Sequence, residues 1–189
     1  YQTSFKKPSL NIYCLDFSGS MEGTGETQLK DAMSQILLQE NASKNFLQAN
    51  AGEVNEVIFF DNTILDIERA ADDSDEALAQ LYQKVADFQI AGGTDIDNAA
   101  AQALAEASSY DLEKYTPAVI LMTDGVSDYN YRTFQNAWDT LGIDVPVFSI
   151  TFGAADPTQL EELAEATGGR VFDGTQDLTE AFRSVKGYN

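Results

Sequence analysis

The feature that most constrains the fold is an apolar segment that ends abruptly in polar residues. Residues 8–16 are rich in apolar and β-favouring side chains, and Phe17-Ser18-Gly19-Ser20 follows them. We interpret the apolar run as a buried strand. Asp16, Ser18 and Ser20 recur at every second position, and in an extended segment this spacing directs all three side chains the same way. One carboxylate and two hydroxyls would then converge at the carboxyl end of a strand, where open α/β sheets bind ligands. Oxygen ligands of this kind suit Mg²⁺, Mn²⁺ or Ca²⁺, so the sequence predicts a metal site.

Strand-like and helix-like segments alternate along the rest of the chain. We expect strands at residues 8–16, 54–60, 63–68, 118–123, 145–151 and 170–172. We expect helices at residues 27–51, 75–88 after an N-cap at Ser74, 95–109, 130–141, 157–167 and 177–186. The segment 63–68 is expected to pair with 54–60 as an antiparallel edge across a turn at Asp61-Asn62. The alternation predicts an α/β fold with a mostly parallel sheet covered by helices on both faces.

Composition limits the organisation of the chain and its partners. The 189 residues are 43% hydrophobic and contain no evident linker, so we expect a single domain over residues 1–189. A formal charge of −20 disfavours nucleic acid and anionic membrane surfaces as partners. The single cysteine, Cys14, is expected to be a small buried residue. The sequence has no signal peptide and no long apolar run, and it begins at Tyr1, so we expect a fragment of a longer protein without direct membrane insertion.

Three short motifs, in order along the chain, resemble the signature of von Willebrand factor type A (integrin I-like) domains. The segment from Asp16 to Ser20 is similar to the family's Asp-x-Ser-x-Ser motif, and Gly92-Gly93-Thr94-Asp95 is similar to its threonine loop. Thr123-Asp124-Gly125 is similar to its second aspartate loop. The resemblance covers nearly the whole chain. It implies a doubly wound sheet of six strands in the order 3-2-1-4-5-6, with strand 3 antiparallel.

The resemblance also implies a metal-ion-dependent adhesion site. On the family pattern, Ser18 and Ser20 coordinate a divalent cation directly and Asp16 acts through water. Thr94 and Asp124 complete the set, the latter directly or through water. Mg²⁺ is the expected ion, with Ca²⁺ and Mn²⁺ as alternatives. An open coordination position would take an Asp or Glu carboxylate from a protein partner, so the resemblance implies a monomeric protein-binding module and not an enzyme.

Other interpretations remain open at this point. Each motif alone is also typical of an ordinary turn or helix start, with Thr94 as an N-cap. A Mg-dependent phosphatase would use a similar opening stretch, but Ser18 stands where that class has its second aspartate. A serine hydrolase would need a base, and the sequence contains no histidine. The segment Ser18-Gly19-Ser20-Met21 and the disulfide-free form look more like bacterial members of the family than animal adhesins, which implies a bacterial adhesion protein that is extracellular or on the cell surface. A cytoplasmic assembly partner of an ATPase or chelatase-like complex is the alternative.

The last expected helix, 177–186, has two interpretations. Leu178, Phe182 and Val185 would anchor it to the core. The favoured interpretation is that it closes the core and stays in place. The alternative is that it moves when the metal site binds a ligand.

Overall fold

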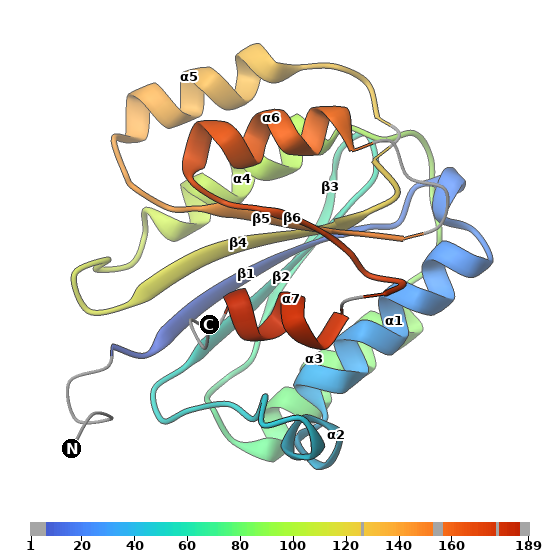
Figure 1. Cartoon of the computed structure of the whole chain (residues 1–189), viewed down its shortest axis with the longest axis vertical. Coiled ribbons are helices and arrows are strands. Elements are labelled where there is room, and N and C mark those ends of the chain that lie inside the picture. The colour runs from blue at the N-terminus through green and yellow to red at the C-terminus, as the bar shows by residue number, and fades with distance from the viewer. Residues whose placement is uncertain (1–6, 126, 153–156, 177, 186–189) are drawn as a thin grey trace.

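A six-stranded sheet in the order β3-β2-β1-β4-β5-β6 forms the centre of the computed structural model, which describes residues 7–125, 127–152, 157–176 and 178–185 (Figure 1). The strands are β1 (Ser9–Asp16), β2 (Val54–Phe60), β3 (Ile64–Arg69), β4 (Thr116–Thr123), β5 (Val147–Thr151) and β6 (Val171–Asp173). Neighbouring strands are parallel except β2 and β3, which are antiparallel. The expected strand order and the antiparallel third strand are therefore confirmed.

Helices cover both faces of this sheet (Figure 1). One face carries α1 (Thr24–Leu37), α2 (Gln39–Lys44), α3 (Asp75–Asp87) and α7 (Leu178–Val185). The other carries α4 (Ile96–Ala107), α5 (Tyr131–Leu141) and α6 (Thr158–Thr167). No helix within the described ranges is long and apolar enough to cross a membrane.

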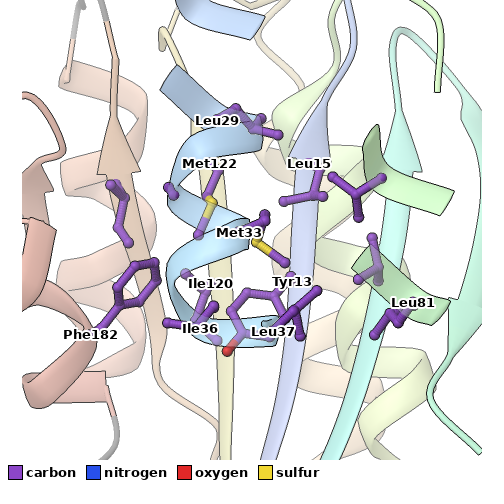
Figure 2. Close-up of a cluster of buried hydrophobic side chains, with 14 of the residues drawn as sticks. Tyr13, Leu15, Leu29, Met33, Ile36, Leu37, Leu81, Ile120, Met122 and Phe182 are labelled. Atoms are coloured by element: carbon purple, nitrogen blue, oxygen red, sulfur yellow. The ribbon is translucent and has the colours of Figure 1, made fainter. Parts of the chain in front are cut away.

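The central strand β1 supplies side chains to two separate core layers. All eight of its residues are buried. Tyr13 and Leu15 belong to the layer under α1, whereas Ile12 and Cys14 belong to the layer under α4, as the two-residue period of a strand requires. Figure 2 shows the first layer, where labelled side chains of α1 lie over those of β1 and β4. Cys14 is a free, buried residue of the second layer, as expected.

The single helix expected over residues 27–51 is wrong. The structure has two helices there, because Leu38 is extended (φ −83°, ψ 107°) and ends α1. Polar side chains after this point satisfy the last carbonyls of α1: Gln39 Nε2 donates to Ile36 O at 3.0 Å, and Asn41 Nδ2 donates to Ser34 O at 3.3 Å. Leu47 is buried as its apolar character suggested, but it follows α2 and lies outside any helix.

Most of the other expected helix ends agree with the structure. Ser74 caps α3 by accepting a hydrogen bond from Ala77 N at 3.1 Å. α6 stops at Gly168, which adopts a left-handed conformation (φ 79°) suited to glycine. The expected start of the last helix at Asp177 and its expected end at Lys186 lie outside the described residues.

Candidate metal centre

Three neighbouring strands end at the same edge of the sheet. In the parallel register, Asp16 of β1 lies opposite Phe60 of β2, and Leu15 lies opposite Met122 of β4. The residues that end or follow these strands are therefore brought together: Asp16, Asp61 and Thr123. The loops after β1 and β4 contain the first and third motifs, so these two motifs lie at the same edge of the sheet.

Asp16 is almost fully buried, with 1% of its surface exposed. Its Oδ1 accepts a hydrogen bond from Ser18 N at 2.9 Å, and its Oδ2 accepts one from Thr123 Oγ1 at 2.6 Å. Burial raises the pKa of Asp16 to about 6, these hydrogen bonds oppose the rise, and the charge of Asp124 adds to it. Among the described residues no ion pair involves Asp16. A nearby cation would offset the cost of this buried charge.

The hydroxyl oxygens of Ser18 and Ser20, which follow Asp16 in the first loop, lie next to each other. Ser18 is buried and extended, and it follows Asp16 as the alternating pattern predicted. The extended spacing does not reach Ser20, because Gly19–Met21 forms a single turn of 3-10 helix. Even so, the two Oγ atoms lie 3.2 Å apart. The side chain of Ser18 makes no capping hydrogen bond to this turn.

The loop that contains Thr94 is docked directly on the first loop. Gly19 N donates to Gly92 O at 2.9 Å, and Ala91 N donates to Phe17 O at 2.6 Å. The N-cap of α4 is Asp95, whose side chain accepts from Asn98 N at 2.9 Å. The interpretation of Thr94 as the N-cap is therefore wrong, and Thr94 is a buried residue at the edge of the first loop.

The third loop brings the second carboxylate, Asp124, which is also buried. Asp124 follows Thr123 directly, and its negative charge contributes to the raised pKa of Asp16. Beside this loop lies a surface pocket of about 280 Å³, lined by Ser20, Gly92, Gly93, Thr94, Ser127 and Asp128. Two of the five predicted ligands, Ser20 and Thr94, thus face one open space. The described residues contain no cluster of three or more His, Cys, Asp or Glu placed to hold a metal, so any ion at this site depends on hydroxyl oxygens.

Sequence reasoning missed the role of Asp61, which it assigned only to a turn. Asp61 Oδ2 accepts from Gly92 N at 3.1 Å, and its carbonyl accepts from Asp95 N at 2.9 Å. Asp61 Oδ1 accepts from Thr63 N at 2.8 Å. A Cβ at position 92 would lie 3.2 Å from Asp61 Oδ2, which explains a glycine there. The sequence signal that could have identified Asp61 is its position directly after β2, the strand that pairs with β1.

Comparisons with known proteins agree with this fold. The family model described as "von Willebrand factor type A domain" matches residues 12–172. No protein with curated function matches the sequence.

Solved structures of low sequence identity share the fold. An aerotolerance-related membrane protein from Bacteroides fragilis is 13% identical with a TM-score of 0.72, and the match covers 94% of this chain and 96% of that one. The pilus adhesin SpaC from Lactobacillus rhamnosus GG is 13% identical with a TM-score of 0.66, covering 97% and 31%. Proximal thread matrix protein 1 from the mussel byssus, described with a zinc-occupied MIDAS motif, is 18% identical with a TM-score of 0.63, covering 95% and 47%. The chain thus spans nearly all of the first structure and less than half of the other two.

Proposed function

The chain belongs to the von Willebrand factor type A domain family, and on that premise we propose that it is a metal-dependent module that binds a protein partner. The observation that carries the proposal is the arrangement around Asp16. A buried carboxylate is held by Ser18 N and by Thr123 Oγ1, and the hydroxyls of Ser18 and Ser20 in the same loop lie 3.2 Å apart. Hard divalent cations prefer oxygen ligands of this kind.

In this proposal five side chains hold one divalent cation. Ser18 and Ser20 bind through their hydroxyls, and Asp16 binds through water or holds the waters in place. Thr94 and Asp124 complete the set from the second and third loops. The two carboxylates balance the charge of a divalent ion, while the three hydroxyls are neutral. Mg²⁺ is the proposed ion, with Ca²⁺ and Mn²⁺ as alternatives, and the zinc described in the mussel protein supports a divalent ion in general.

The bound cation would supply an electrophilic position that accepts an Asp or Glu carboxylate oxygen from the partner. The pocket beside Ser20 and Thr94 gives that carboxylate a route to the site. The residues of the chain then bind and orient the ion, and none of them is proposed to transfer a proton. We therefore propose a binding function without catalysis.

The proposed setting is the outside of a bacterial cell, with this module acting as a monomer. The pilus adhesin and the membrane protein among the solved structures support that setting. A cytoplasmic partner of an ATPase or chelatase-like complex is the alternative. Fractionation of the source cells with an antibody against this domain separates the two: surface exposure supports the first, and co-purification with a cytoplasmic ATPase supports the second.

A crystal structure grown with magnesium and acetate tests the site itself. We expect one Mg²⁺ bonded to Ser18 Oγ and Ser20 Oγ at about 2.0–2.1 Å, with an acetate or water oxygen facing the pocket. A cation enclosed entirely by protein ligands would contradict the proposed carboxylate-binding position. A cation bound elsewhere on the acidic surface would contradict the assignment of the ligands.

A further inference from the structure

Three buried oxygen atoms without hydrogen-bond partners belong to side chains that are tied to one loop, residues 127–130. They are Asp97 Oδ1 in the first turn of α4, and Gln159 Oε1 and Glu162 Oε1 in α6. Within the described ranges each of these atoms is buried and accepts no hydrogen bond. Asp97 is only 1% exposed. Buried acceptors in folded proteins are normally paired, so each of these three oxygens calls for a partner such as a water or an ion.

Residues 127–130 fix these side chains by their other polar atoms. Asp97 Oδ2 accepts from Asn130 N at 2.8 Å, and Glu162 Oε2 accepts from Tyr129 Oη at 2.9 Å. Gln159 Nε2 donates to Ser127 O at 3.4 Å. Gln159 and Glu162 are three residues apart in α6, so they lie on the same helix face. Each side chain is thus held at one end and keeps one oxygen unpaired.

The carboxylates of Asp97 and Glu162 carry negative charge that no ion pair within the described part of the chain neutralises. Burial raises the pKa of Asp97 to about 6, the hydrogen bond from Asn130 N opposes the rise, and the negative charges of Asp95 and Glu162 add to it. Both carboxylate oxygens of Asp95 accept hydrogen bonds within the protein, one from Asn98 N and the other from Asn130 Nδ2. Among the residues the structure describes, no ion pair involves Asp97 or Glu162. A second negative charge near the buried carboxylate of Asp97 is unfavourable unless a positive charge offsets it.

We propose that Asp97, Gln159 and Glu162 form a second cation site, separate from the one at Ser18 and Ser20, and that its ion is Ca²⁺. Two carboxylate oxygens and one amide oxygen are typical calcium ligands, and waters or backbone carbonyls complete the six to eight that Ca²⁺ takes. Two carboxylates also balance its charge. Mg²⁺ fits less well because it demands near-ideal octahedral geometry and releases its waters reluctantly.

The proposed site has a direct structural connection to the first metal centre. Asp128 N donates to Thr94 O at 3.0 Å, and Ser127 Oγ donates to the same carbonyl at 3.3 Å. Ser127 Oγ also accepts from Ile96 N at 2.9 Å. Ca²⁺ between α4 and α6 would therefore hold residues 127–130 in place against Thr94, which lies at the first site. The second site does not depend on metal binding at Ser18 and Ser20.

Calcium titration of four proteins tests this proposal by calorimetry. Wild type is expected to bind two Ca²⁺ ions, and Asp16→Ala is expected to keep one of them. In the Asp16→Ala background, Glu162→Gln should weaken the remaining site by about tenfold or more, since it removes a charged ligand but leaves an oxygen for Tyr129. Glu161→Gln in the same background is the matched control, because Glu161 is an exposed neighbour in the same helix. It should bind as tightly as its parent.

Terbium luminescence gives a second readout that reports position. Tb³⁺ at the proposed site would be sensitised by Tyr129, whose hydroxyl bonds to Glu162. We expect this emission in Asp16→Ala, its displacement by Ca²⁺, and its loss in the added Glu162→Gln variant. If Asp16→Ala is folded and binds no Ca²⁺, or if Glu162→Gln and Glu161→Gln behave alike, the second site does not exist. If instead the Glu162-dependent site is present and Asp16→Ala changes nothing, the first site fails and this one stands.

Discussion

Thr123 Oγ1 donates a hydrogen bond of 2.6 Å to Asp16 Oδ2, and this bond joins the ends of two neighbouring strands of the sheet. Thr123 Oγ1 in turn accepts from Gly125 N at 3.1 Å, so one hydroxyl orients both the carboxylate of the first loop and the backbone of the third. The proposed metal centre therefore rests on Thr123, a residue that is not among those lining the pocket.

Removing this support should weaken metal binding without removing a proposed ligand. Thr123→Val keeps the shape of the side chain and deletes its hydroxyl, and we expect Mg²⁺ affinity to fall about 10–100-fold. Calorimetry measures this, with Thr116→Val at the exposed start of β4 as the control. Equal affinity in the two variants would show that the hydrogen bond to Asp16 has no part in metal binding.

Asp61 should hold the threonine loop against the first loop. Asp61→Ala deletes the acceptor of Gly92 N and Thr63 N, two part-buried hydrogen bonds that contribute about 0.5–1.5 kcal/mol each. We expect lower stability in urea and also weaker Mg²⁺ binding, because Thr94 follows Gly92 and Gly93. Asp66→Ala on the exposed side of β3 is the control. A stability loss with unchanged Mg²⁺ affinity would limit Asp61 to a structural role.

Glu56 should make the protein less stable as the pH rises. Glu56 is 4% exposed on β2, and burial together with a hydrogen bond and the charge of Glu106 raises the pKa of Glu56 to about 8. The folded state therefore holds a proton that the unfolded state releases at its ordinary pKa of 4.5. The stabilisation by this proton is full below about pH 4.5 and is lost as the pH rises through about 8.

Urea unfolding of wild type and Glu56→Gln from pH 5 to pH 9 measures this effect. The variant keeps a neutral side chain, so its stability should fall less than that of wild type over the same interval. Glu113→Gln, at an exposed position, should follow wild type. Parallel curves for wild type and Glu56→Gln would mean that Glu56 does not retain its proton in the folded state.

The last helix is expected to close the core and stay in place. Phe182 of α7 is 1% exposed and lies in the same cluster as Ile36 and Ile120 (Figure 2). Phe182→Ala should destabilise the protein by about 3–5 kcal/mol through loss of burial and the cavity left behind. Mg²⁺ affinity should not change. An increase in Mg²⁺ affinity alongside the lower melting temperature would favour the alternative, in which α7 moves with the state of the metal loops.

The sequence was sufficient for the fold because its signals were local and repeated. The apolar run of β1 and the alternation of strands with helices required no knowledge of distant contacts. The family resemblance added the strand order, which local patterns do not specify. The helix expected over 27–51 was wrong because apolar periodicity continues to Leu47, while the break depends on how Gln39 and Asn41 turn back to cap α1.

The sequence predicted the motifs of the candidate metal centre but not how their side chains are arranged in space. The first loop bends after Ser18 into a 3-10 turn, and only the structure shows that its two hydroxyls still meet. Asp61, Asp97 and Glu162 carry no recognisable motif. Their roles depend on hydrogen bonds to residues about 30 positions away, such as Gly92 and Asn130, and those follow from packing of the loops.

The most direct test of the account is a Mg²⁺ titration of wild type, Asp16→Ala and Asp144→Ala by calorimetry. Asp144 is an exposed aspartate in the connection between α5 and β5, so it controls for the loss of one negative charge from a very acidic protein. The account predicts one Mg²⁺ site in wild type and Asp144→Ala, and none in a folded Asp16→Ala. Unchanged Mg²⁺ affinity in Asp16→Ala would contradict it.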